Sequence, residues 1–197
     1  MTDGNLNSVL RHLRRVVESQ GAGGLNDSQL LERFITHGDE TAFEVLVWRH
    51  GPMVLNVCRR ILRHDHDAED AFQATFMTLA RKAACIGKRA SLASWLYKVA
   101  YRAALAAKAI VAKNSTLEKQ IRNRTNAGPD QVAAIIEFRQ VLDAELNRLP
   151  KKYRAPFILC YLEGLTIEQA AHQLGWPKGT VGTRLAWARQ RLASRIT

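Results

Sequence analysis

The segment from Gly164 to Leu185 constrains the fold of this chain most, because it has the features of two short helices joined by a tight turn. Thr166, with Gln169 three residues later, can form a capping box at the start of the first helix. Gly175 is suited to end that helix and Pro177 to open the next one. A short helix, a tight turn and an arginine-rich second helix form the arrangement that docks in the major groove of DNA. The segment therefore predicts a helix-turn-helix that binds duplex DNA.

Composition agrees with a polyanionic partner. The 197 residues carry a formal net charge of +11, an excess that favours nucleic acid or an acidic membrane surface. No apolar run approaches the ~20 residues that span a bilayer, and residues 1–7 lack the basic start and apolar core of a secretion signal. Three scattered cysteines argue against a disulfide framework and fit a reducing compartment. We therefore expect a cytoplasmic protein without a membrane span.

Apolar residues recur at helical spacing and never alternate over the length of a strand. This pattern predicts an all-α fold of two small helical domains, a four-helix N-terminal domain and a C-terminal helix-turn-helix domain, joined by a flexible linker. Polar composition and a Gly-Pro break at Gly128 mark the linker. The predicted parts are a polar N-terminal arm at 1–25, the N-terminal domain at 26–112, the linker at 113–131 and the C-terminal domain at 132–197.

The predicted helix over 67–83 has two distinct faces. At about 100° per residue, one face gathers the side chains that we expect in the core, which are Ala68, Phe72, Thr75, Phe76 and Leu79. Another face gathers Asp70, Gln73 and Met77, and an exposed methionine beside an acid and an amide is typical of a protein-binding patch. The alternative is that the acidic residues of this segment only stabilise the helix N-terminus. Spacing alone leaves both uses open.

The next segment is basic, since residues 81–117 contain eight Lys or Arg and no Asp or Glu. In the helix predicted within it, the residues expected on the core face are Leu92, Trp95, Leu96, Val99, Ala103 and Ala106. Tyr97, Lys98 and Tyr101 should then lie outside the core, where rings can stack on unpaired bases and ammonium groups can hold phosphates. The basic loop 87–91 is suited to close over a base that has left the duplex. The alternative is an ordinary solvated basic face.

The second helix of the helix-turn-helix supplies the candidate contacts to duplex DNA, because its N-terminal residues usually reach base edges. The residues at these positions are Lys178, Thr180, Thr183 and Arg184. Basic residues further along are suited to phosphates, and such contacts give an affinity that falls steeply with salt. Trp176 and Trp187 are expected to pack rather than to contact bases.

The sequence contains no catalytic constellation. It has no Gly-rich phosphate loop, no His-Glu-x-x-His motif and no Cys-x-x-Cys pair. His64 and His66 flank Asp65, but this spacing in an acidic turn is more often a solvated loop than a metal site. We therefore expect neither an enzyme nor a bound cofactor or metal ion.

Three motifs in this order resemble those of a bacterial RNA polymerase sigma factor of the sigma-70 family, in the extracytoplasmic-function (ECF) group. The segment Asp67–Phe76 resembles the helix that binds the polymerase clamp, and Ser94–Ala100 resembles the helix that melts the promoter and reads its −10 element. Leu149–Arg154, followed by the helix-turn-helix, resembles the region that reads the −35 element. The resemblance extends over roughly 26–110 and 135–195, and the three motifs together, at these spacings, make it specific.

The resemblance implies a promoter reader with two domains. Its partners would be core RNA polymerase, through the clamp helices and the flap, promoter DNA and, as in many relatives, an anti-sigma factor. The implied clamp contacts are Asp70, Gln73 and Met77, and the −35 contacts are the four helix-turn-helix residues given above. The implied −10 contacts are Lys88, Arg89, Ser91, Tyr97, Lys98, Tyr101 and Arg102. Gly182, Trp187 and Arg102 depart from the residues frequent in the family, so the promoter sequence cannot be taken from relatives.

Two other classes of protein contain such a DNA-binding motif. A stand-alone helix-turn-helix regulator usually dimerises to read two half-sites, and the sequence has neither a heptad seam nor a dimerisation segment. An enzyme that acts on DNA, such as a recombinase with a helix-turn-helix tail, would need a nucleophile cluster, and the sequence offers none. The stand-alone regulator is therefore the alternative to a sigma factor.

Overall fold

The computed structural model describes residues 24–62, 64–86, 91–119 and 141–196. Within these ranges the backbone forms helices and turns without a strand, which confirms the all-α prediction. Nearly all of the predicted N-terminal arm, most of the predicted linker, and both Lys88 and Arg89 lie outside the described residues. Among the helices that are described, none is long and apolar enough to cross a membrane.

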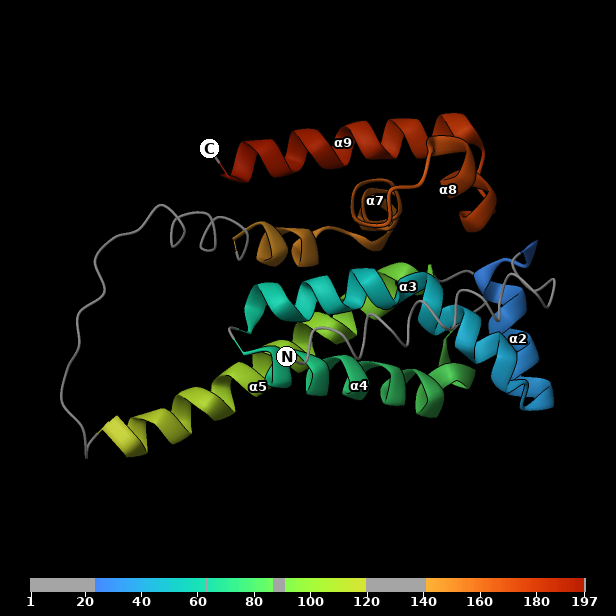
Figure 1. Ribbon diagram of the computed structural model, residues 1–197. Helices are drawn as coiled ribbons and strands as arrows, with labels where there is room; N and C mark the ends of the chain where they lie inside the picture. Colours follow the sequence, from blue (N-terminus) through green and yellow to red (C-terminus); the bar gives the residue numbers. More distant parts are fainter. Residues whose placement is uncertain (1–23, 63, 87–90, 120–140, 197) are drawn as a thin grey trace.

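The described part of the N-terminal domain contains four α-helices, as predicted (Figure 1). They are α2 (Asp27–His37), α3 (Glu40–Ile61), α4 (Asp65–Lys82) and α5 (Leu92–Lys119), with a 3-10 turn η2 (Ala83–Cys85) after α4. Asn26 caps α2 in a capping box with Gln29, and Gly38 ends it at a φ of 63°, where a residue without Cβ is favoured. Helix α5 continues to Lys119, into the segment that was predicted as linker.

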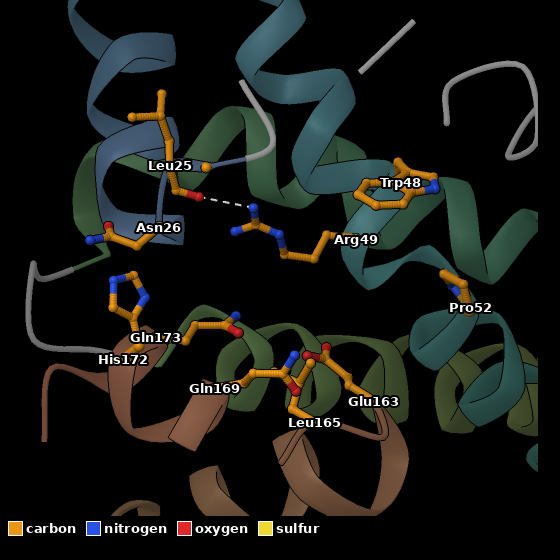
Figure 2. A pocket seen from close by; sticks show the side chains of 11 residues that line it. Leu25, Asn26, Trp48, Arg49, Pro52, Glu163, Leu165, Gln169, His172 and Gln173 are labelled. Carbon is orange, nitrogen blue, oxygen red and sulfur yellow. Dashed lines mark hydrogen bonds between the residues drawn. The ribbon is translucent and has the colours of Figure 1, made fainter. Parts of the chain in front are cut away.

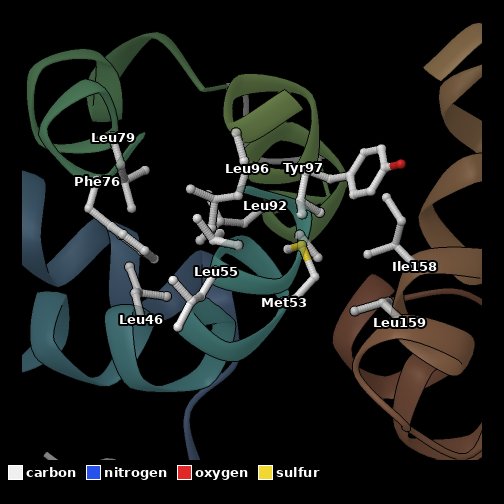
Figure 3. Close-up of a cluster of buried hydrophobic side chains, with 14 of the residues drawn as sticks. Leu46, Met53, Leu55, Phe76, Leu79, Leu92, Leu96, Tyr97, Ile158 and Leu159 are labelled. Carbon is white, nitrogen blue, oxygen red and sulfur yellow. The ribbon is translucent and has the colours of Figure 1, made fainter. Parts of the chain in front are cut away.

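One hydrophobic core holds these helices together (Figure 3). Leu46 of α3, Leu79 of α4 and Leu96 of α5 are each 0% exposed, and burial of such side chains is worth about 25 cal/mol per Å² of apolar surface. The same cluster continues into the C-terminal domain, where Ile158 and Leu159 are also 0% exposed. The core is therefore continuous across the two domains.

The C-terminal domain is a chain of short helices that ends in a long one. Residues 141–148 are helical and are followed by α7 (Lys151–Phe157), the π-helical turn η3 (Ile158–Leu162), α8 (Ile167–Leu174) and α9 (Lys178–Ile196). Thr166 Oγ1 accepts the Gln169 N–H at 3.2 Å, and Gln169 Oε1 accepts the Thr166 N–H at 2.9 Å. Gly175 ends α8 at a φ of 64°. The helix-turn-helix, with its predicted capping box and glycine stop, is confirmed.

The two domains pack directly on each other, with α5 in contact with α7 and η3. Figure 1 shows α9 on the outer side of the C-terminal domain, away from the N-terminal helices. The structure corrects the predicted faces of α5 at both ends of the helix. Tyr97, expected outside the core, is 0% exposed, because α5 packs against its own domain and also against the C-terminal domain. Ala106, expected in the core, is exposed, because it lies in a part of α5 where nearly all residues of 105–112 are exposed.

Candidate DNA and polymerase interfaces

The exposed face of α4 carries Asp70, Gln73 and Met77, here called the α4 patch. Met77 is 58% exposed, which distinguishes this face from one covered only by charged side chains. The residues buried on the opposite side include all those predicted: Ala68, Phe72, Thr75, Phe76 and Leu79. Thr75 fits there because its hydroxyl donates to the Ala71 carbonyl at 2.7 Å. The predicted division of α4 into a core face and an exposed face is confirmed.

The four candidate −35 residues lie on the first two turns of α9. They are Lys178 and Thr183, which are exposed, and Thr180 and Arg184, which are half-buried. Lys178 forms an ion pair with Glu168 of α8, and such an exposed pair contributes little to stability. The Thr183 hydroxyl donates to the Gly179 carbonyl at 2.9 Å. Lys178 and Thr183 can therefore turn to DNA at small cost, because the contacts that they give up are solvent-exposed.

Two tryptophans lie close to these residues, and each makes a contact through its ring. The guanidinium carbon of Arg184 lies 4.2 Å from the ring centroid of Trp176, a cation–π geometry. Trp187 stacks on Tyr153 of α7, with ring centroids 3.7 Å apart. Trp187 thus packs α9 against α7, as predicted for it. The contact of Trp176 with Arg184, a candidate DNA contact, was not predicted from the sequence.

Helix α5 carries the candidate −10 residues that the structure describes. Ser91 precedes α5, and its Oγ accepts a backbone N–H three residues later at 3.3 Å, so it helps to cap the helix. Arg102 is exposed, whereas Lys98 and Tyr101 are half-buried. The charge of Arg154, with burial and then Arg102, lowers the pKa of Lys98. This lowering reflects a locally positive potential, which suits a polyanion.

Tyr97 is not available for base stacking in this structure, contrary to the prediction. Its hydroxyl donates to Asp143 Oδ1 at 2.6 Å, and burial, followed by the Asp143 charge, raises the pKa of Tyr97 above its usual range. Arg60 completes what we call the Asp143 cluster, with Nε at 2.9 Å and Nη2 at 2.8 Å from the two carboxylate oxygens. Asp143 belongs to the C-terminal domain, so that domain covers this face of α5.

A second polar cluster joins the domains around His50 of α3, which is 0% exposed. His50 Nε2 lies 3.0 Å from Asp27 Oδ2, and Nδ1 lies 2.6 Å from Glu163 Oε1. Arg49 Nη1 donates to Asp27 Oδ1 at 2.6 Å, and Gln173 Nε2 donates to Asp27 Oδ2 at 2.7 Å. Glu163 and Gln173 come from the C-terminal domain. These five residues, called the His50 cluster, therefore bridge the two domains.

The two carboxylates keep His50 protonated. Burial by itself would lower the pKa of His50, but Asp27 and Glu163 outweigh it and raise the pKa to about 10. Burial would likewise raise the pKa of Asp27, but His50 and Arg49 lower it well below the usual range. Both ring N–H groups of the imidazolium therefore donate, one to a carboxylate of each domain.

Neither cluster was predicted from the sequence. The available signal was the position of His50, four residues after Leu46 and four before Val54, on the apolar face of α3. A histidine at such a position needs buried partners. One of these partners, Glu163, lies 113 residues further along the chain. No local sequence pattern identifies such a distant partner.

A pocket of about 590 Å³ lies beside the His50 cluster, between the two domains (Figure 2). Trp48 and Pro52 line it from the N-terminal domain, and Gln169 and His172 from the C-terminal domain. Within it, Arg49 Nη2 donates to the Leu25 carbonyl at 2.9 Å. Over the described parts of the chain, no group of His, Cys, Asp or Glu residues could hold a metal ion.

Two helical domains on one chain, with a helix-turn-helix in the second and a basic helix in the first, are typical of a DNA-binding protein. The sequence matches Sigma-70 region 2 over residues 46–109 and Sigma-70, region 4 over residues 139–192. The chain belongs to the sigma-70 family, in the group of ECF RNA polymerase sigma factors.

Two relatives in other bacteria are named as members of the same group. The chain is 31% identical over 179 residues to the ECF RNA polymerase sigma factor SigM of Mycobacterium tuberculosis (strain ATCC 25618 / H37Rv), covering 88% of this chain and 87% of SigM. It is 28% identical over 185 residues to the ECF RNA polymerase sigma-E factor of Escherichia coli (strain K12), covering 87% and 95%. A solved structure of the sigma factor RpoE in complex with the anti-sigma factor NepR from Bartonella quintana has 21% identity and a TM-score of 0.39, covering 78% and 96%.

The family confirms the predicted general function. The protein is a sigma factor that directs core RNA polymerase to promoters and binds promoter DNA. The stand-alone regulator is not favoured, because both sigma regions are matched in order on one chain.

Proposed function

We propose that this sigma factor is a non-catalytic cytoplasmic protein that reads a promoter at two separate elements. Residues 26–112 bind the polymerase clamp and the −10 element, residues 132–197 bind the −35 element, and residues 113–131 connect them. The observation that carries the proposal is that the candidate binding surfaces are divided between the two matched sigma regions. The α4 patch and basic α5 belong to the region 2 match, whereas the exposed start of α9 belongs to the region 4 match.

Run-off transcription with purified core RNA polymerase tests the proposal. Templates come from transcript starts that are mapped after overexpression of the protein. We expect discrete transcripts from these templates only when core polymerase and this protein are both present. Absence of a transcript from every template, together with tight binding of the protein alone to the same duplexes, would instead support a stand-alone regulator.

Arg184 is proposed to contact a base of the −35 element. We expect Arg184→Ala to weaken binding to a duplex with the cognate −35 element by about 1–3 kcal/mol and to relax the preference at one base pair. Fluorescence anisotropy with the cognate duplex and its single-base variants measures both effects. An equal loss on all of these duplexes would mean that Arg184 contacts phosphate.

Two further variants serve as comparisons for Arg184→Ala. One tests whether Trp176 positions Arg184, and the other shows the effect of losing a phosphate contact. Trp176→Leu keeps an apolar side chain but removes the ring beneath Arg184, so it should reproduce part of the Arg184→Ala loss. Arg189→Ala removes an exposed arginine further along α9. We expect Arg189→Ala to weaken binding uniformly across sequences and to reduce the salt slope by about 1.

The α4 patch is proposed to bind the clamp helices of core polymerase. We expect Asp70→Ala with Gln73→Ala to weaken binding to core by about tenfold, as for central contacts of a protein interface, and to leave the circular dichroism spectrum unchanged. The matched control is Asp65→Ala with His66→Ala, two exposed residues in the first turn of the same helix. Competition with a labelled sigma factor for core measures both pairs, and equal effects would contradict the assignment.

The −10 contacts are proposed to come from α5 and the loop before it. Ser91 lies just before α5, and Lys98, Tyr101 and Arg102 lie on it. Arg102 is exposed, whereas the other three are half-buried. Tyr97 can join them only after the C-terminal domain has left α5, because Asp143 holds its hydroxyl. An anti-sigma partner stays a prediction from the family resemblance.

A further inference from the structure

We propose that the pocket beside the His50 cluster is a docking site for residues 1–23 of the same chain, here called the leading segment. The leading segment lies outside the described residues. It binds in the pocket through its Leu and Val side chains. The inference goes beyond the proposed function, which assigns no role to the pocket or to this segment.

The pocket has apolar walls that are only partly covered. Its volume of about 590 Å³ lies within the range of pockets that bind ligands. Leu25, Trp48 and Leu165 line it and are half-buried, and Pro52 lines it and is exposed. Figure 2 shows Leu25 and Trp48 on one side of the pocket and Leu165 on the other. Apolar walls that remain accessible to water favour an apolar occupant.

The charged residues of the lining are paired within the protein. Arg49 Nη1 lies 2.6 Å from Asp27 Oδ1, and Glu163 Oε1 lies 2.6 Å from His50 Nδ1. His172, the remaining ionisable residue of the lining, is exposed. A small ion would have to compete with these pairs for the same groups, whereas an apolar side chain leaves them intact. The lining therefore fits an occupant that is apolar where it enters the pocket.

The leading segment joins the described chain at the pocket itself. Gly24, Leu25 and Asn26 are the first described residues, and all three line the pocket. Residues 21–24 read Gly-Ala-Gly-Gly, and four residues extend over at most about 14 Å. A segment on such a short connection has an effective concentration in the millimolar range at the pocket. Weak apolar contacts are then enough to hold it there.

The sequence of the leading segment supplies the matching apolar side chains. At about 100° per residue, all of its Leu and Val residues fall within one arc of about 120°, and they are Leu6, Val9, Leu10, Leu13, Val16 and Val17. Arg11, Arg14 and Arg15 fall outside this arc. The spacing is typical of an amphipathic helix, whose apolar face needs a partner surface. The pocket is such a surface and lies directly beside the point of attachment.

Hydrogen–deuterium exchange of the full chain, read by mass spectrometry, tests the docking. We expect the amides of residues 6–17 to exchange on the order of tenfold more slowly in the wild type than in Pro52→Asp. A segment that is docked about 90% of the time gives a difference of that size. Pro52→Asp places a carboxylate in the apolar wall, and an aspartate is tolerated inside a helix better than a proline.

The matched control is Asn56→Asp, which introduces the same side chain one turn further along α3. Asn56 is exposed and is not among the residues that line the pocket. Asn56→Asp should therefore leave the exchange of residues 6–17 as slow as in the wild type. Circular dichroism melting of both variants establishes that the helical domains remain folded.

A second variant tests the docking from the side of the segment. Leu10→Asp with Leu13→Asp changes no residue of the described core and should speed exchange of residues 6–17 as much as Pro52→Asp does. Its pocket is then open to a labelled peptide with the wild-type sequence of residues 1–23. We expect this peptide to bind with a Kd of about 0.1 mM, tenfold below the effective concentration of the attached segment. Adding Pro52→Asp to the same protein should abolish this binding, as measured by fluorescence anisotropy.

Three outcomes would overturn the inference. Exchange of residues 6–17 that Pro52→Asp leaves unchanged means that the pocket does not hold the leading segment. Protection that increases with protein concentration means that the segment of a second copy occupies the pocket. Peptide binding that survives Pro52→Asp means that the segment binds elsewhere on the protein. If Pro52→Asp fails to fold, Leu10→Asp with Leu13→Asp decides the question by exchange, and unchanged protection in that variant contradicts the docking.

Discussion

Leu79→Ala is expected to lower the free energy of unfolding by about 3 kcal/mol, within the range observed for buried Leu→Ala changes. Leu79 is 0% exposed on the core face of α4, so its truncation loses apolar burial and leaves a cavity among close-packed neighbours. Urea denaturation followed by circular dichroism measures the change as a lower midpoint at an unchanged slope. Molecules that remain folded should still bind core polymerase, because the α4 patch is intact.

Met77→Ala is the matched control, since it removes a long apolar side chain two residues earlier on the same helix. Met77 is 58% exposed, so the free energy of unfolding should change by no more than about 0.5 kcal/mol. Its effect should appear in the affinity for core polymerase. A loss of stability similar to that of Leu79→Ala would contradict the division of α4 into a core face and a binding face.

The stability of the wild-type protein is expected to fall by about 2 kcal/mol between pH 6.5 and pH 8.5. The pKa of His50 rises from 6.5 to about 10 in the folded protein, through Asp27 and Glu163 and against the effect of burial. A raised pKa stabilises the folded form fully below pH 6.5, and this stabilisation is lost as the pH rises towards 10. The unfolded chain releases the His50 proton in this window, whereas the folded form retains it.

Asp27 and Cys58 should contribute little to the pH dependence of stability between pH 6.5 and pH 8.5. Asp27 has a lowered pKa, so its contribution is lost only as the pH falls below its usual value of 3.8. The thiol of Cys58, whose pKa burial raises to about 12, contributes only above its ordinary value of 9.0. His50→Gln should abolish most of the pH dependence and lower stability at pH 6.5. Urea denaturation at each pH measures both proteins, and parallel curves would show that His50 is not the titrating group.

Sequence reasoning succeeded where one element has a single set of neighbours. The core face of α4 was predicted correctly because Phe72, Phe76 and Leu79 recur at helical spacing, and because α4 packs mainly against α3 and α5 of its own domain. The helix-turn-helix was predicted because Thr166, Gln169 and Gly175 act through their own backbone neighbours. Interactions that are local in sequence leave a local pattern.

Sequence reasoning failed on α5 because this helix has two sets of neighbours. Tyr97 was assigned to solvent by a one-face analysis, yet Asp143, 46 residues further along the chain, covers it. His50 shows the same limitation, since it meets Glu163, 113 residues away. Partners at such separations are brought together by the packing of whole domains, and neither periodicity nor motif spacing encodes that packing.

The amino-acid sequence by itself determined the helices, the helix-turn-helix, the α4 patch and the family, because each follows from local spacing or from a short motif. Only the tertiary structure decided which surfaces of those helices are accessible. Docking of the C-terminal domain buries Tyr97 and His50 and leaves the start of α9 exposed. The physical reason is that burial depends on contacts between segments far apart in the chain, whereas helix formation and capping depend on residues within a turn of one another.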